Sequence, residues 1–488
     1  MELDIRCLNK ENFPSLAWVA QVDLSFLGYI TVWCGELVET GPDYVVEGVW
    51  PGDFNDMEFD TSELFYGSGV RIKGDSIFFV SSCSTVDRIW CHREGDSITV
   101  SNSLPCLLDV VGVNLVESND CYASLVESIV SGRKYKRFFP VNKGELQVHY
   151  FENVIVKGDN VHISSKCEYL DRFDQFESYA RFLFQTAEEI GRNSRDPLRK
   201  RPIGIFSTIS RGYDSPVASV LAKLAGSKKT VTIKSARSLL GRSDSGADIA
   251  AVIGLECEEY ISERSNIRDE LWYWAANGSL QDMNLSIFDY PVGPSVIFTG
   301  FNGGMIWEKS GSLTNDWLRR KDSTGLGFCE HRLVKGVIHC PVPFWGIRNI
   351  ADIKKISNDP KMLPWSLGGG YDRPIPRRIL EEAGVPRHYF GQTKSATAVD
   401  ELLLLPIQKT LMKDYLSFQK VHYGKVNIIY TLPISRKIID LWREVFRQRV
   451  LDMFGRIRVI RKRSRTFKWE RGLFPWANHI LKLKLRRK

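Results

Sequence analysis

Several features that mark secreted, membrane-spanning or metal-bound proteins are absent from this sequence of 488 residues. Its first residues, MELDIRCLNKENF, lack a basic segment followed by an apolar one, so we expect no signal peptide. No uninterrupted apolar run reaches about 18 residues, and no membrane-spanning helix is predicted. The ten cysteines form no CxxC pair and no Cys/His ladder, which favours reduced, buried thiols over a zinc site. We therefore expect a cytoplasmic protein.

The composition is that of a folded protein, with 43% hydrophobic and 25% charged residues. The length favours two domains with a tail, and no repeat or low-complexity linker interrupts the chain. The net charge of +8 is concentrated at the C-terminal end, where 13 Lys and Arg stand against the single acid Glu470 from Arg456 onward. The remaining chain is slightly acidic, so the overall charge does not indicate what the protein binds.

Residues 1–170 have the pattern of a β-rich domain. Short segments such as YITVWCGELV, SIFFVSSC, SITVSNS, LQVHYF and NVHISS are rich in β-branched and aromatic residues. Gly, Asp and Asn turns separate them, as in a packed antiparallel domain.

From about residue 171 the pattern changes to alternating helices and strands. FESYARFLFQTAEEIGR, SPVASVLAKLAG and GADIAAVIGLE have helical spacing, whereas RPIGIFSTIS, KKTVTIKS and SVIFTG are short apolar runs typical of buried strands. This order predicts an α/β domain over residues 171–440 with a parallel sheet and a ligand at the C-terminal ends of its strands. Residues 441–488 are predicted to form a basic helical tail.

The most informative segment is the turn SRGYDS, residues 210–215, between the first predicted strand and a helix. The N–H groups at a helix N-terminus attract phosphate, and the hydroxyls of Ser210 and Ser215 can bind the same oxyanion. Gly212 allows the backbone to approach a phosphate closely, and Asp214 is better suited to a magnesium ion than to phosphate. The alternative is an Asp-Ser helix cap after a turn.

This turn resembles the SGGxDS pyrophosphate loop of the ATP-pyrophosphatase family, and most of all that of asparagine synthetases, β-lactam synthetases and lasso-peptide cyclases. Later segments resemble the same family in order, over about residues 175–410. They are KTVTIKS, which includes Thr232; SDSGADIAAVIGLECEEY; VIFTGFNGGMIWEKSG, a second glycine-rich loop with Gly300 and Gly303; HCPVPFWGI; and PRRILEEAGVPRHYFGQTKSA, which includes Lys394. The N-terminal half resembles a class II glutamine amidotransferase in GDSITVSNSLPCLL.

The resemblance implies an enzyme that adenylates a small or peptide carboxylate with ATP and Mg²⁺ and transfers it to an amine or ammonia. It implies that Lys394 is catalytic and that Asp214 binds the metal. The nucleotide-binding residues implied are Ser210, Arg211, Gly212, Asp214, Ser215, Thr232, Gly300 and Gly303.

The sequence departs from the family pattern at three places. Arg211 replaces a loop glycine, and its guanidinium would obstruct the phosphate or add a contact to it. Gly304 and Met305 stand where the second loop has acidic residues, which weakens the predicted metal site. Glu2 stands where glutamine-dependent members have a cysteine. We therefore expect an inactive glutaminase fold and a free amine as nucleophile, and a non-catalytic binding or scaffold protein is the alternative function.

The basic tail contains Phe467, Trp469, Phe474 and Trp476 among its cations. Such mixing predicts either contact with an anionic membrane surface or acidic partner, or a helix packed on the body of the protein. Nucleic acid is a further alternative for the same cations, but because no RNA-binding module is visible, no nucleic-acid partner is expected.

Overall fold

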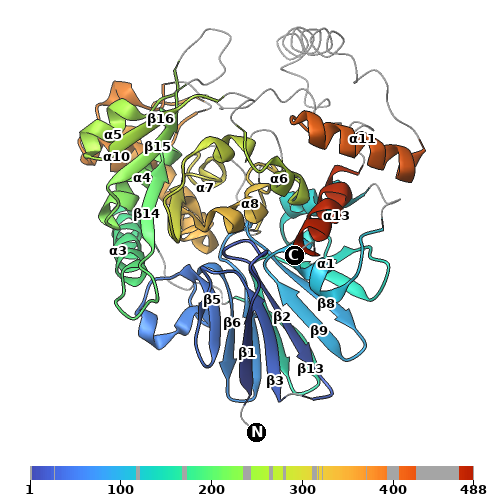
Figure 1. Cartoon of the computed structure of the whole chain (residues 1–488). Coiled ribbons are helices and arrows are strands. Elements are labelled where there is room, and N and C mark those ends of the chain that lie inside the picture. The colour runs from blue at the N-terminus through green and yellow to red at the C-terminus, as the bar shows by residue number, and fades with distance from the viewer. Residues whose placement is uncertain are drawn as a thin grey trace.

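The computed structural model describes residues 3–26, 28–116, 121–166, 173–234, 243–262, 267–278, 282–309, 316, 318–320, 322–369, 371–392, 406–424 and 472–486. The N-terminal half is a sandwich of two sheets, as its β-rich pattern predicts, and Figure 1 shows it below the α/β half. The first sheet has the strand order β1 (Asp4–Asn9), β3 (Tyr29–Cys34), β2 (Trp18–Asp23), β9 (Ser97–Ser101), β8 (Ile89–Glu94), β11 (Glu145–His149) and β10 (Phe138–Phe139). The second has the order β13 (Asn160–Ser165), β12 (Glu152–Lys157), β7 (Ser76–Val80), β6 (Tyr66–Lys73), β5 (Tyr44–Val49) and β4 (Glu39–Thr40).

Alternating side chains of these strands form the core between the two sheets. Val22 and Ile98 from the first sheet pack in one cluster with Val70 and Ile77 from the second, because successive residues of a strand point to opposite faces. Neighbouring strands are antiparallel except β1 and β3, which pair in parallel. Helices α1 (Leu104–Val111) and α2 (Tyr122–Glu127) share another cluster with the outer face of the first sheet.

The C-terminal half contains the predicted parallel sheet, with five strands. Their order is β16 (Glu256–Tyr260), β15 (Lys229–Ile233), β14 (Gly204–Thr208), β17 (Ser295–Thr299) and β18 (Val337–Pro341). The chain therefore runs outward from β14 to β16 and returns to the other side of β14 at β17. In sheets of this kind, the ligand crevice lies where the strand order reverses, which here is between β14 and β17.

Helices cover both faces of this sheet. The buried cluster on one face includes residues of α3 (Phe176–Ser194), α4 (Asp214–Leu224), α5 (Ala247–Ile253), α9 (Ile350–Asn358) and α10 (Pro374–Glu382). The cluster on the other face includes residues of α6 (Glu270–Ala275), α8 (Phe328–Lys335) and α11 (Lys409–Tyr423). Along β17, Val296 and Phe298 belong to the first cluster and Ile297 to the second, which explains why these three consecutive residues are all apolar.

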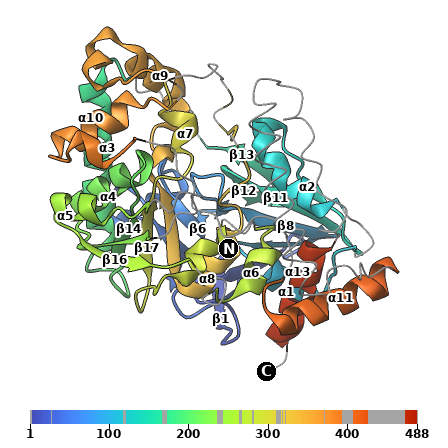
Figure 2. The same ribbon diagram turned by 90° about the horizontal axis from the view of Figure 1, so that it is seen from above.

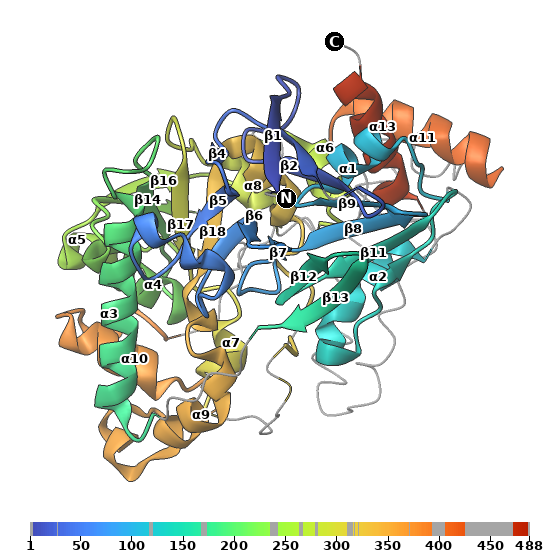
Figure 3. The same cartoon turned by 90° about the horizontal axis from the view of Figure 1, so that it is seen from below.

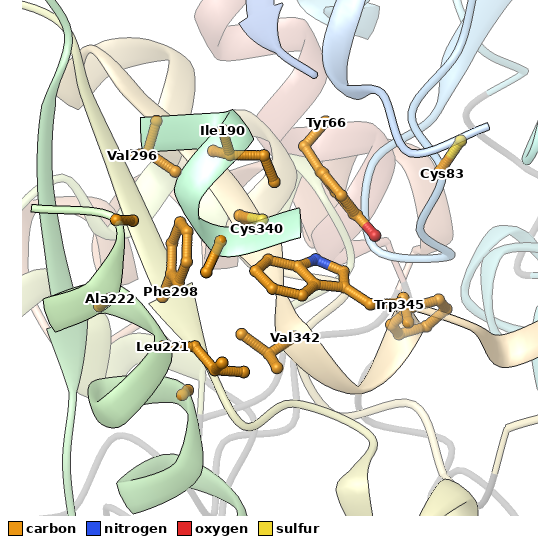
Figure 4. Packing of buried hydrophobic residues seen from close by; sticks show 14 of the residues in the cluster. Tyr66, Cys83, Ile190, Leu221, Ala222, Val296, Phe298, Cys340, Val342 and Trp345 are labelled. Carbon is orange, nitrogen blue, oxygen red and sulfur yellow. The ribbon is translucent and has the colours of Figure 1, made fainter. Parts of the chain in front are cut away.

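The two halves share a buried boundary. Figure 3 shows β5 and β6 of the sandwich beside β18, and in Figure 4 Tyr66 of β6 lies next to Trp345. Buried charges also cross it: Arg332 of α8 binds Glu47 with two hydrogen bonds of 2.8 and 2.9 Å and Asp87 with one of 2.5 Å. Glu330 accepts a hydrogen bond of 2.7 Å from Ser103. Arg332 thus contacts carboxylates of the sandwich.

The end of the basic tail is helical and packs on the body of the protein. Helix α13 (Leu473–Arg486) contacts α1 and α6, and Figure 2 shows it beside α1 and α11. Phe474 and Trp476 are buried in these contacts. Phe467, Trp469 and the rest of the predicted tail before residue 472 lie outside the described residues. Among the described helices, none has the length and apolar character needed to cross a bilayer.

Candidate functional site

The predicted phosphate turn lies at the point where the strand order of the parallel sheet reverses. Strand β14 ends at Thr208 and α4 begins at Asp214. The adjacent strand β17 ends at Thr299 and is followed by α7 (Gly303–Ile306). Because β14 and β17 pair in parallel, the two connections after them lie at the same edge of the sheet. The structure therefore brings together the two segments that the sequence analysis assigned to nucleotide binding.

Two glycines of the second connection lie against the first turn of α4. A Cβ atom added at Gly300 would lie 2.3 Å from the carbonyl carbon of Asp214 and 2.4 Å from the nitrogen of Ser215. A Cβ atom added at Gly303 would lie 2.2 Å from the carboxylate carbon of Asp214. Side chains at these positions would separate the two connections. Gly300 thus allows close packing of the two backbone segments, and Gly303 leaves room for the Asp214 side chain.

The hydroxyl groups of the turn converge at the beginning of α4. The Oγ atoms of Ser210 and Ser215 are 2.8 Å apart, and the backbone N–H of Gly212 donates to Ser210 Oγ at 3.2 Å. Ser210 also pairs with Ser245 in an isolated antiparallel bridge, which fixes the far side of the turn. Two hydroxyls and a backbone N–H beside a helix N-terminus are donors suited to one phosphate group.

The carboxylate of Asp214 forms an ion pair with Arg373, the residue that precedes α10. Their side chains are 18% and 5% exposed, respectively, so the pair is largely shielded from water. Burial opposes the charge of Arg373, but the Asp214 carboxylate outweighs that effect and raises the pKa of the arginine. The cation next to Asp214 is therefore a permanently charged guanidinium.

These residues do not fit a magnesium ion bound as the family resemblance implies. The carboxylate of Asp214 already pairs with Arg373, and Gly304 supplies no second carboxylate. A Cβ atom at Gly304 would lie 2.9 Å from Arg373 Nη2, so the guanidinium lies directly beside this position. In the described part of the chain, no group of three or more His, Cys, Asp or Glu side chains is placed to hold a metal ion.

Arg211 extends away from the other residues of the turn. Its Nε donates to the carbonyl of Ser245 at 3.2 Å, and its Nη2 lies 2.7 Å from Asp248 of α5. Both side chains of this ion pair are about half exposed. In this conformation the guanidinium neither obstructs the turn nor contacts the serine hydroxyls.

Two predicted site residues remain, Thr232 and Lys394. Thr232 is buried on β15, and its hydroxyl accepts a hydrogen bond of 3.1 Å from the N–H of Gly246. Lys394 lies outside the described residues. Gly391, three positions earlier, donates its N–H to the carbonyl of Arg211 at 2.8 Å. The described end of the segment that precedes Lys394 thus lies against the turn.

Two residues of the site, Arg373 and Tyr371, carry no sequence pattern that predicts their place there. The ring of Tyr371 lies 4.9 Å from that of Tyr213, and its hydroxyl lies 3.5 Å from the Cβ position of Gly212. Burial and the nearby Asp214 raise the pKa of Tyr371, so its hydroxyl stays protonated and able to donate. The segment YDRPIP carries no motif that would have revealed these roles.

Known proteins give little guidance for this chain. No protein-family model matches it, and no curated protein matches at a significant level. A glutamine phosphoribosylpyrophosphate amidotransferase from B. subtilis, in complex with ADP and GMP, is similar with a TM-score of 0.19 and 9% identity, over 60% of this chain and 70% of that one. A structure described as the allosteric regulatory enzyme of purine biosynthesis has a TM-score of 0.21 and 10% identity, over 65% and 88%. Such TM-scores carry no argument about function.

Proposed function

We propose that this protein uses ATP to activate a carboxylate and then forms an amide bond with an amine or ammonia. The observation that carries the proposal is the turn of residues 210–215 at the reversal point of the sheet. There the hydroxyls of Ser210 and Ser215 meet the N-terminus of α4, and Gly300 packs the second connection against it. This arrangement of donors suits the departing pyrophosphate of an adenylation reaction.

The proposed reaction has two steps. A carboxylate oxygen of the substrate attacks the α-phosphorus of ATP, the bond to the bridging oxygen breaks, and pyrophosphate leaves with that electron pair. The amine nitrogen then attacks the acyl carbon, loses a proton and displaces AMP. Negative charge builds on pyrophosphate in the first step, so donors that are already in position there lower its barrier.

Lys394 is proposed, by resemblance to the asparagine synthetase-like family, as the cation that stabilises these transition states. The sandwich is proposed to be a class II amidotransferase-like domain without glutaminase activity, so that the nucleophile is an amine of the substrate or free ammonia. The substrate is proposed to be a small or peptide carboxylate.

Release of pyrophosphate tests the proposal. The full chain is incubated with ATP, Mg²⁺ and panels of carboxylates and amines, and pyrophosphate and AMP are measured. We expect both products in equal amounts with a matching substrate pair. Lys394→Met should lower kcat while ATP binding persists, whereas Arg192→Met, on the 73% exposed side chain of a surface arginine, should change neither. If Lys394→Met no longer binds ATP, the proposed role of Lys394 in stabilising the transition states is contradicted.

A second candidate is a binding protein that retains the nucleotide site without catalysis. The ion pair between Asp214 and Arg373, together with the glycine at position 304, favours it. Such a protein would be stabilised by ATP against heat, because a ligand that binds only the folded state shifts the unfolding equilibrium. It would release no pyrophosphate with any carboxylate of the panel.

A further inference from the structure

A carboxylate next to a phosphate site requires a cation. Asp214 begins α4, and the adjacent residue Ser215 carries one of the two hydroxyls of the turn. A phosphate bound to these hydroxyls would bring negative charge close to the Asp214 carboxylate. Like charges repel strongly in a partly buried site, where water screens them less. Whatever neutralises Asp214 therefore determines whether an anion can bind.

Arg373 supplies such a cation and has one unused donor. Its Nη1 pairs with Asp214, and its Nε is buried without a hydrogen-bond partner in the described part of the chain. The ring of Tyr371 packs 5.0 Å from its guanidinium carbon. A guanidinium has five N–H donors and normally uses them when it is buried. An unused donor on a 5% exposed side chain that pairs with Asp214, the residue next to Ser215, indicates a ligand that is itself an anion.

The space beside Asp214 is already filled by the guanidinium. Gly304 leaves room for it, since a Cβ there would lie 2.9 Å from Arg373 Nη2. Magnesium needs near-octahedral oxygen ligands at about 2.0–2.1 Å, usually including one or two carboxylates. The guanidinium occupies Oδ2 of Asp214, and its positive charge opposes a metal ion at the same carboxylate.

We infer that Arg373 is the cation of this phosphate site, and that the site binds the pyrophosphate group of a nucleotide without magnesium. The inference rests on the proposed function only in that the turn binds a polyphosphate. The incoming anion accepts hydrogen bonds from the guanidinium and from the hydroxyls of Ser210 and Ser215. Asp214 competes with the anion for Arg373, so it weakens binding instead of supporting it.

The two accounts of Asp214 predict opposite results for one substitution. Inorganic pyrophosphate and ATP are titrated into the full chain by calorimetry, once with EDTA and once with Mg²⁺. We expect the wild type to bind pyrophosphate and ATP in the presence of EDTA. Asp214→Asn should tighten pyrophosphate binding about tenfold, equivalent to ~1.4 kcal/mol, because the competing carboxylate is gone. A magnesium site at Asp214 predicts the reverse, with binding lost in EDTA and lost in Asp214→Asn.

Substitutions of the arginine complete the test. Arg373→Met should abolish pyrophosphate binding, and Arg373→Lys should retain a part of it, since a lysine keeps the charge but not the fork of donors. Arg192→Met is the control for loss of a surface arginine. If Arg373→Met does not fold, Asp214→Asn and Arg373→Lys still decide the question.

The outcomes separate this inference from the function proposed above. Wild-type binding only with Mg²⁺ overturns the role of Arg373 and leaves the nucleotide site standing. If Arg373→Met binds pyrophosphate in EDTA as tightly as the wild type does, the role of Arg373 is also overturned. No binding of either probe in either buffer overturns both proposals.

Discussion

Alanine at position 300 would separate the two connections that form the proposed phosphate site. The added Cβ would lie 2.3 and 2.4 Å from backbone atoms of Asp214 and Ser215. Because no side-chain rotation can relieve a contact with backbone, either the β17 connection or the first turn of α4 must move. Overpacking of this kind costs about 1–3 kcal/mol. The shift would also move the Ser215 hydroxyl away from that of Ser210.

Gly204→Ala is a matched control in the same sheet. Gly204 begins β14, and a Cβ there would meet nothing within 4 Å. Alanine at such a site stabilises the folded protein by about 0.4–1 kcal/mol, because it lowers the conformational entropy of the unfolded chain. We expect Gly300→Ala to unfold at lower urea concentration than Gly204→Ala, as followed by tryptophan fluorescence, and to bind pyrophosphate more weakly. Equal unfolding midpoints and equal binding would refute the reasoning that this close contact shapes the site.

Two further predictions concern the buried charges between the halves. Arg332→Met leaves the Glu47 and Asp87 carboxylates buried without their cation, which should cost about 3–5 kcal/mol in urea unfolding; an unchanged midpoint would show that the pair does not hold the halves together. Burial raises the pKa of Glu330 from 4.5 to about 7. Because the folded state then holds the proton more tightly, this contribution to stability is complete below pH 4.5 and is lost as the pH rises through about 7. Glu330→Gln should remove that decline from unfolding midpoints measured between these pH values.

The strands that build the site could be predicted because their burial is visible in the sequence. GIFST, KTVTI and SVIFT are apolar or β-branched runs, and they form β14, β15 and β17. Strand β16 was not predicted, because its sequence ECEEY has three acidic residues. It is an edge strand that pairs only with β15, so its side chains are partly exposed and tolerate charge.

The site itself was predictable where its residues are contiguous. Ser210, Gly212 and Ser215 lie within the six residues 210–215 that follow β14, so the strand, the turn and the helix could be recognised together in the sequence. Arg373 was not predictable, because it meets Asp214 across 159 positions of sequence. The packing of α10 against α4 brings Arg373 and Asp214 together, and no local sequence pattern predicts this ion pair.

A crystal structure of the protein grown with ATP tests the central claim most directly. The account predicts that β- and γ-phosphate oxygens lie within about 3 Å of the Ser210 and Ser215 hydroxyls and of the Arg373 guanidinium. It also predicts that the distance between the two serine hydroxyls increases as the phosphate enters between them. A nucleotide bound elsewhere, with the serine hydroxyls still bonded to each other and Arg373 still bonded only to Asp214, would contradict the claim.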